Sequence, residues 1–397
     1  MPMKEKIKIA FAHHNISHNT QGIMAGITDY MRNKGDWQLI VWPDSSLKSL
    51  EFLKHRGCKG AFVSVQTSIK AQQLLEIGIP VIAVTALQDM LNLPFVSADS
   101  ELVAKMAFDY FTKKHFRHFG YFGLTEALWS RQRLDHFSRC VAQVEGHVHV
   151  YEGEQLSITN ETPFTKLWTD MVLNKDQQEL ADWLRQVPKP IAILASCDIL
   201  ACHLSNVARE AGLTIPDETA ILGVNDDQAL CNLCDPPLSS IAFNLKKAGG
   251  DAARLMDNLI AGKEMLRGQW IQIQPAYVKS RGSTDIFAID DPDVIAALTY
   301  IRKNSQTSLQ VDDVAHNVCV SKRSLQMKFQ KSLGHSVHDE IVHAHFEIAK
   351  ALLIDTNLPI DEIAARSGFH YTTNLRRVCK ELTGMLPHIY RQTHRLS

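Results

Sequence analysis

Between residues 7 and 280, short apolar runs alternate with longer stretches in which apolar residues recur three or four positions apart. Short apolar runs predict strands, and the longer periodicity predicts amphipathic helices. The predicted strands are 7–12, 38–42, 60–65, 80–85, 118–123, 191–195 and 220–224, and the clearest helices are 22–31, 101–111, 201–211 and 248–260. Regular alternation of strand and helix is typical of parallel sheets with helices on both faces. Because a single sheet of so many strands is uncommon, we expect two α/β lobes with a cleft between them.

The alternation ends at the segment 281–293, RGSTDIFAIDDPD, which combines Gly, Ser, Pro and four Asp residues. This composition is typical of a linker. From Pro292 onward the sequence has helical patterns and no further strand pattern. We therefore expect an α/β domain over 1–282, a linker over 283–291 and an all-α domain over 292–397.

Two segments of the all-α domain, 311–331 and 360–381, share a short helix, a tight turn and a second helix. Ser321 is a suitable N-cap for one second helix, and Gly368–Phe369 forms the turn before the other. The second helices expose polar and basic side chains: Lys322, Arg323, Gln326 and Lys328, then Thr372, Thr373, Arg376 and Arg377. In a DNA major groove Arg reads guanine, Gln reads adenine and Lys neutralises phosphate. A plain helical domain with solvated basic faces is the alternative, but two copies in register favour a double helix-turn-helix that binds DNA.

Residues 336–355, between the two copies, predict one amphipathic helix. A helix of about 18 residues is about 27 Å long, and successive major grooves on one face of DNA lie about 34 Å apart. Such a helix could hold two reading helices in adjacent grooves.

The all-α domain resembles the DNA-binding domain of AraC/XylS-type regulators. The residues that carry the resemblance are Ala315, Ser321, Leu325, Phe329 and Gly334, followed by the runs IAARSGF and PHIYR. The resemblance implies that Arg323, Gln326, Met327, Thr372, Thr373 and Arg377 occupy base- and phosphate-contacting positions.

Residues 7–280 resemble the sensing domain of LacI/GalR-type regulators. The resemblance rests on FVSADSELVAKMAFDYF, HFRHFGYFG, RQRLDHF and ASCDILACHLSNVAREAGLTIPDETAILGVNDDQ. It implies a two-lobed domain that closes on a small sugar. A sensor placed before an AraC-type reader resembles regulators of xylose utilisation. That order implies a homodimeric activator that responds to D-xylose or a related aldose, binds operator half-sites in double-stranded DNA and contacts RNA polymerase.

Candidate sugar ligands follow the predicted strands, because ligands of open α/β sheets bind beyond the carboxyl ends of the strands. Arg133, Asp198 and Asn225 suit the hydroxyls of an aldose, and Trp129 suits its ring. His13, His14 and Asn15, just after the first strand, are further candidates. Two alternatives stay open: an interlobe salt bridge between Arg133 and Asp198, and plain loop roles for the two histidines. Asn225 stands where the family usually has Asp, which leaves the identity of the sugar open.

Bulk properties narrow the function classes. A net charge of −1 argues against nucleic acid wrapped over the whole surface, so DNA contacts must be local. The apolar run 7–12 is too short for a signal peptide or a membrane span, and we expect a cytoplasmic protein. The eight cysteines are expected to be buried thiols.

No common catalytic or cofactor motif is present: there is no Walker A loop, GxSxG, GxGxxG or HExxH. Cys231 and Cys234 form a lone CxxC without the second pair that a zinc site requires. We expect no catalysis, no cofactor and no metal. The alternatives are a repressor, a regulator of another small molecule, a sugar-binding transport component, and an enzyme on a Rossmann-like scaffold.

Overall fold

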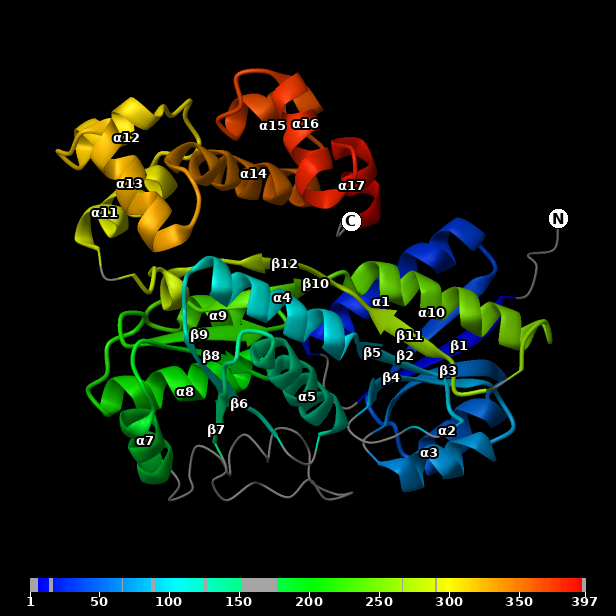
Figure 1. Ribbon diagram of the computed structural model, residues 1–397. Helices are drawn as coiled ribbons and strands as arrows, with labels where there is room; N and C mark the ends of the chain where they lie inside the picture. Colours follow the sequence, from blue (N-terminus) through cyan, green and yellow to red (C-terminus); the bar gives the residue numbers. More distant parts are fainter. Residues whose placement is uncertain are drawn as a thin grey trace. The chain divides into compact units, whose positions relative to one another are not determined.

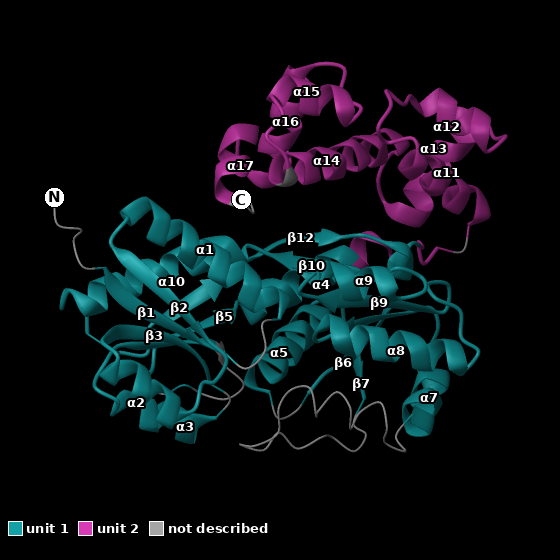
Figure 2. Ribbon diagram, turned by 180° about the vertical axis from the view of Figure 1, so that it is seen from behind, with its two compact units in different colours: residues 1–110, 118–285 teal, residues 111–117, 286–397 magenta. Residues whose placement is uncertain are grey.

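The computed structural model describes residues 6–13, 17–65, 67–86, 90, 92–124, 127–151, 177–265, 267–289 and 291–394. The chain forms two compact units (Figure 2). The first comprises residues 1–110 and 118–285, and the second comprises 111–117 and 286–397.

The first unit contains two six-stranded sheets, each of which defines a lobe (Figure 1). The first lobe has the strand order β11-β5-β4-β3-β1-β2, and all its strand pairs are parallel. The second lobe has the order β12-β10-β9-β8-β6-β7, in which β12 runs antiparallel to β10. The strands are β1 Ile7–Ala12, β2 Trp37–Trp42, β3 Cys58–Val65, β4 Val81–Ala86, β5 Phe95–Ala98, β6 His118–Phe122, β7 Val148–Val150, β8 Ile191–Ala195, β9 Thr219–Val224, β10 Ser239–Phe243, β11 Trp270–Ile273 and β12 Pro275–Lys279.

Helices of the first unit connect these strands. They are α1 His18–Lys34, α2 Leu47–His55, α3 Ser68–Leu75, α4 Ser100–Lys113, α5 Leu128–Ala142, α7 Gln177–Gln186, α8 Asp198–Glu210, α9 Gln228–Leu233, α10 Leu245–Ile260 and the short 3-10 helix η1 Gly282–Thr284. The last turn of α4 belongs to the second unit. Helices α1 and α10 touch through their backbones, because a Cβ on Gly26 would lie 1.9 Å from the Lys246 carbonyl oxygen and one on Gly249 would lie 2.0 Å from that of Ile23. Glycine at both positions therefore permits the close packing of the two helices.

The second unit contains the helices α11 Pro292–Lys303, α12 Val311–Asn317, α13 Lys322–Leu333, α14 Val337–Asp355, α15 Ile360–Arg366, α16 Thr372–Thr383 and α17 Pro387–His394. Leu325 and Phe329 of α13 are buried together with Val314 of α12 and with Leu298 and Ile301 of α11. The long helix α14 joins the α12–α13 pair at one end to the α15–α16 pair at the other (Figure 1).

The predicted architecture of two parallel α/β lobes followed by a helical domain is confirmed. Every predicted strand and every predicted helix overlaps an observed one, while β5, β7, β10, β11 and β12 were missed. The expectation of thiols is wrong for one pair, since Cys202 and Cys234 form a disulfide with their Cα atoms 5.9 Å apart. Within the described residues, none of the helices combines the length and hydropathy that crossing a membrane requires.

Candidate effector cleft and candidate DNA interface

The two lobes of the first unit meet at a pair of asparagine side chains. Asn19, in the first turn of α1, donates through Nδ2 to Oδ1 of Asn225, which directly follows β9, over 3.1 Å. The remaining oxygen of Asn19 is buried and has no hydrogen-bond partner among the described residues. Because unpaired buried polar atoms are costly, this amide is suited to a ligand placed between the lobes.

The loop after β9 has an unusual backbone. Asn225 and Asp226 have φ values of 121° and 50°, in the left-handed region that residues other than glycine seldom adopt. Three hydrogen bonds hold the loop: Asn225 N–H to the Ile241 carbonyl at 3.0 Å, Asp226 N–H to Ser240 Oγ at 3.0 Å, and Asp227 N–H to Asp198 Oδ2 at 2.8 Å. The surroundings therefore fix the placement of the Asn225 side chain.

Asp198, the first residue of α8, lies beneath this loop and is only 1% exposed. Ser240 Oγ donates to its Oδ1 over 2.5 Å, and its Oδ2 accepts from Asp227. Burial raises the pKa of this carboxyl to about 7. Both oxygens are thus bonded within the second lobe, and Asp198 supports the loop that carries Asn225. Since Arg133 belongs to the same lobe, the interlobe salt bridge considered above does not form between them.

Arg133 of α5 is a buried cation at the carboxyl end of β8. Its Nη1 donates to the carbonyl oxygen of Ser196, and its guanidinium carbon lies 5.3 Å from the centre of the Trp129 ring. Burial lowers its pKa. Arg133 Nε is buried without a hydrogen-bond partner among the described residues, and the Ser196 hydroxyl lies beside it, next to Tyr121. A donor and a hydroxyl next to an aromatic ring are suited to a polyhydroxylated ring.

His13 directly follows β1 and is buried, with its ring stacked on Phe11 at 6.3 Å between centroids. His14 and Asn15 lie outside the described residues. Sequence reasoning missed Asn19 and Ser196. Ser196 directly follows a predicted strand, which is the position where ligands of such sheets bind, so that signal was available.

The first reading helix of the second unit is α13. Cys319, with φ 55°, turns the chain after α12, and Ser321 Oγ caps α13 by accepting from Ser324 N–H at 3.1 Å. Arg323, Gln326 and Met327 are exposed, and Met327 is 60% exposed. Lys322 is also exposed and pairs with Asp312 at 3.1 Å. An exposed apolar Met beside Arg and Gln suits a groove that presents thymine methyl groups as well as polar base edges.

Lys328 is placed differently from the other candidates on α13. Its ammonium lies 3.0 Å from the Asp291 carboxylate and 2.7 Å from that of Asp293, at the N-terminus of α11. The hydrogen bond with Asp293 is the main cause of a raised pKa of Lys328. The structure therefore directs this lysine toward α11, about 140° around the helix from Arg323.

The second candidate reading helix is α16. Gly368 has φ 78° in the turn before it, and a Cβ at this position would lie 2.5 Å from Nε2 of His345. Thr373, Arg376 and Arg377 are exposed, while Thr372 is half-buried. Arg377 also pairs with Glu381 at 2.8 Å within the same helix. Tyr371, 70% exposed just before α16, is an aromatic side chain that sequence reasoning missed.

Known domains match both parts of the chain. Residues 108–284 match the periplasmic binding protein-like domain, and residues 314–393 match a helix-turn-helix domain. The chain is thus a DNA-binding transcription regulator that joins a periplasmic binding protein-like domain to an AraC-type helix-turn-helix domain. The domain types that the two sequence resemblances implied are confirmed.

Two of the relatives align with this chain over most of their length. The chain is 26% identical over 380 residues to the xylose operon regulatory protein of Escherichia coli (strain K12), covering 94% of this chain and 93% of that protein. It is 27% identical over 303 residues to the xylose operon regulatory protein of Haemophilus influenzae, covering 76% and 75%. The solved structure of a xylose-binding transcription activator has the same fold, with a TM-score of 0.59 and 24% identity over the full length of both chains.

Proposed function

We propose that this regulator is a sugar-gated activator whose effector is D-xylose or a closely related aldose bound between the two lobes. The observation that carries the proposal is the Asn19–Asn225 hydrogen bond between the lobes, with an unpartnered buried amide oxygen beside it. The relatives named for a xylose operon support the choice of sugar.

The cleft residues have distinct roles in this proposal. The amides of Asn19 and Asn225 exchange hydrogen bonds with sugar hydroxyls, and Arg133 Nε donates to a further hydroxyl. Ser196 Oγ adds a donor or acceptor, Trp129 lies against the ring, and His13 contributes from the first lobe. Asp198 acts by holding the Asn225 loop. The two amides, the Ser196 hydroxyl and the indole of Trp129 carry no charge, which suits an uncharged polyol.

Regulation follows from differential binding. A sugar that binds the closed cleft better than the open one shifts the population toward the closed state, and the shift can alter how the reading helices address DNA. We propose that the chain acts in the cytoplasm as a homodimer on operator half-sites, contacts RNA polymerase, and works by binding without catalysis. A repressor, or a regulator of another pentose or hexose, is the second candidate, because Asn225 replaces the family's usual Asp.

The base-contacting residues in this proposal are those exposed on the two helices, together with the half-buried Thr372. They are Arg323, Gln326 and Met327 on α13 and Thr372, Thr373, Arg376 and Arg377 on α16. Lys322, at the start of α13, is assigned to phosphate.

Ligand specificity is tested by thermal unfolding with a panel of aldoses: D-xylose, L-arabinose, D-ribose and D-glucose. A sugar at one hundred times its Kd stabilises the folded state by about 2.7 kcal/mol. Arg133→Lys keeps the charge but loses the planar fork, so it should weaken the shift. Arg131→Lys, on the exposed side of the same helix, is the matched control. A wild-type protein that no aldose stabilises would overturn the proposal.

DNA regulation is tested by selecting duplexes from a random library with and without D-xylose, followed by transcription with RNA polymerase from a promoter that carries the selected site. Higher transcript levels with D-xylose support an activator. Lower levels support the repressor instead.

A further inference from the structure

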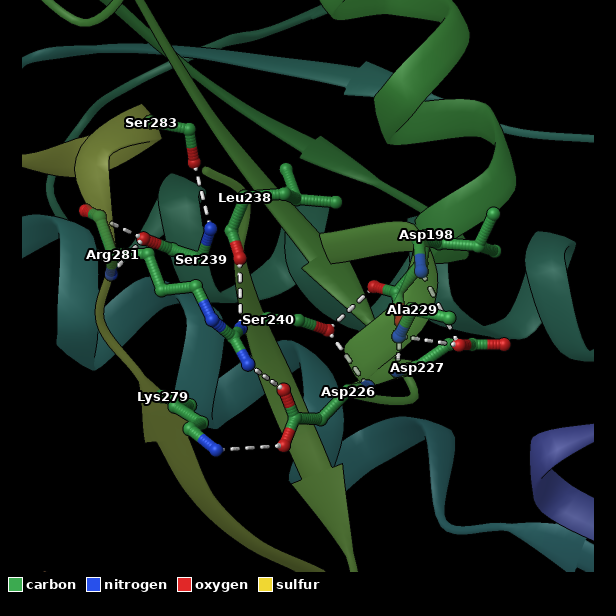
Figure 3. A network of polar contacts seen from close by, with 11 residues as sticks. Asp198, Asp226, Asp227, Ala229, Leu238, Ser239, Ser240, Lys279, Arg281 and Ser283 are labelled. Atoms are coloured by element: carbon green, nitrogen blue, oxygen red, sulfur yellow. Dashed lines mark hydrogen bonds and ion pairs between the residues drawn. The ribbon is translucent and has the colours of Figure 1, made fainter. Parts of the chain in front are cut away.

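A buried polar network connects the loop after β9 with the segment that leaves the first unit (Figure 3). Asp226, next to Asn225 in the loop, pairs with Arg281 through Oδ1 and Nη2 at 2.6 Å. Their side chains are only 9% and 11% exposed. An ion pair so shielded from water is screened little by salt. Removing either partner would leave the other as an uncompensated buried charge, which is strongly destabilising.

Arg281 has further bonds that fix its position. Its Nη1 donates to the carbonyl oxygen of Leu238 at 2.8 Å, and its backbone N–H donates to Ser239 Oγ at 2.7 Å. The guanidinium therefore joins the Asp226 loop to the start of β10. If Asp226 moves, Arg281 must move with it, or the ion pair between them breaks.

Ser283 and Thr284, which closely follow Arg281, are hydrogen-bonded to the start of β10. Ser239 N–H donates to Ser283 Oγ at 2.8 Å, and the hydroxyls of Ser239 and Thr284 lie 2.7 Å apart. Ser283 Oγ in turn donates to the Ile221 carbonyl in β9 at 2.6 Å. Ser283 and Thr284 are fully buried, and the first unit ends at Asp285. The second unit resumes at Ile286, two residues beyond Thr284, the last residue of this network.

The network also adjoins the candidate effector cleft, through Asn225. Asn225 and Asp226 are adjacent, and both have left-handed backbones that three hydrogen bonds hold in place. A loop restrained in this way has few ways to absorb a movement of Asn225 by itself. Movement at the cleft would therefore pass to Asp226.

We infer that the Asp226–Arg281 pair transmits occupancy of the cleft to the connection between sensor and reader. In this role Asp226 and Arg281 are positioning residues: they do not touch the sugar or the DNA, and they couple the two binding events. The inference rests on the proposed sugar-gated function and adds the residues through which gating passes.

The structure offers a matched control. Lys279 Nζ also approaches Asp226, but at 3.9 Å and with a side chain that is 37% exposed. In Figure 3 the one interaction drawn from the Lys279 side chain is the one to Asp226. Lys279→Gln removes a positive charge at the same carboxylate and leaves the Arg281 connection intact.

The test compares wild type, Arg281→Gln and Lys279→Gln as full-length proteins. Hydrogen exchange is followed at residues 223–227 and 282–289 with and without D-xylose, and affinity for a selected duplex is measured in both states. In wild type D-xylose should change exchange in both segments and change DNA affinity by about 5- to 150-fold, the usual range of allosteric coupling. In Arg281→Gln the change at 223–227 should remain, the change at 282–289 should vanish, and the ratio of the two DNA affinities should approach one. Lys279→Gln should behave as wild type.

The outcomes separate this inference from the proposed function. If wild type responds to D-xylose and Arg281→Gln keeps the full ratio of DNA affinities, the coupling role is overturned while sugar gating stands. If wild type responds to no aldose, the proposed function fails and the inference fails with it. If circular dichroism shows that Arg281→Gln does not fold, Asp226→Asn removes the other partner of the same ion pair. The ratio of DNA affinities with and without D-xylose is then measured for Asp226→Asn, and a ratio as large as that of wild type overturns the coupling role.

Discussion

Asn19 and Asn225 are 206 positions apart in sequence, yet a single hydrogen bond of 3.1 Å joins their side chains across the two lobes. Both lie at carboxyl ends of parallel strands or just beyond them, where this type of sheet binds ligands. In the proposed function, closure of the lobes and binding of the sugar therefore depend on the same two side chains.

Asn19→Ala should weaken sugar binding, and it should lower the stability of the free protein by about 1 kcal/mol because the bond to Asn225 is already present without sugar. A typical hydrogen bond contributes about 1 kcal/mol, so losing one sugar contact should lower affinity about fivefold. Calorimetric titration with D-xylose measures the affinity, and thermal unfolding without sugar measures the stability. Asn33→Ala, an exposed asparagine of the same helix, is the control. Equal affinities for Asn19→Ala and wild type would show that the amide does not contact the sugar.

Asp198 predicts a pH dependence of stability. Because burial raises the pKa of the folded-state carboxyl to about 7, the folded protein binds this proton more tightly than the unfolded chain, whose ordinary value is 3.8. Between about pH 4 and pH 7 the folded state then carries the extra proton, and stability from this group falls as pH rises.

Asp198→Asn removes this ionisation, so the free energy of unfolding of wild type relative to the variant should decrease from pH 4 toward pH 8. Denaturant unfolding at several pH values measures the difference. A flat difference for Asp198→Asn would mean that the carboxyl is ionised throughout.

The architecture could be predicted from local patterns, but several strands and site residues could not. β5 and β11 have only four residues, and β11 exposes Trp270 and Gln272, so neither gives a continuous apolar run. β10 begins with Ser239 and Ser240, two fully buried hydroxyls whose side-chain partners lie about 40 positions away. Local periodicity cannot detect such partners, because they come together only in the folded chain.

The same limit applies to the candidate sites. Asn225 was identified as a candidate by its residue type and strand-end position, and Arg133 by its residue type and the family resemblance. Asp198 has the same signals, but its neighbours Ser240 and Asp227 occupy both of its oxygens. Asn19 escaped detection because only its contact with the second lobe distinguishes it from other asparagines near helix starts.

Arg323→Ala should weaken DNA binding and leave sugar binding unchanged. An arginine that reads a base contributes about 1–3 kcal/mol of discrimination, so affinity for a selected duplex should fall and sequence preference at one position should relax. Lys331→Ala removes an equal charge from the exposed last turn of the same helix and should cost less, without a change in preference. Binding to duplexes with single substitutions measures both effects. Equal losses for the two variants would mean that Arg323 only neutralises phosphate.

Lys328→Met distinguishes a structural role of this lysine from a role in DNA binding. Since its ammonium pairs with Asp291 and Asp293 at the start of α11, its loss should lower the thermal midpoint of the helical domain and reduce affinity for DNA much less than Arg323→Ala does. Asp293→Asn removes one of these partners without touching α13 and should lower the midpoint in the same direction. Unfolding curves and duplex titrations at two salt concentrations give both quantities. A loss of DNA affinity as large as that of Arg323→Ala, with an unchanged thermal midpoint, would instead place Lys328 against phosphate. In that case the salt dependence of DNA binding should also become shallower, because one phosphate contact has been removed.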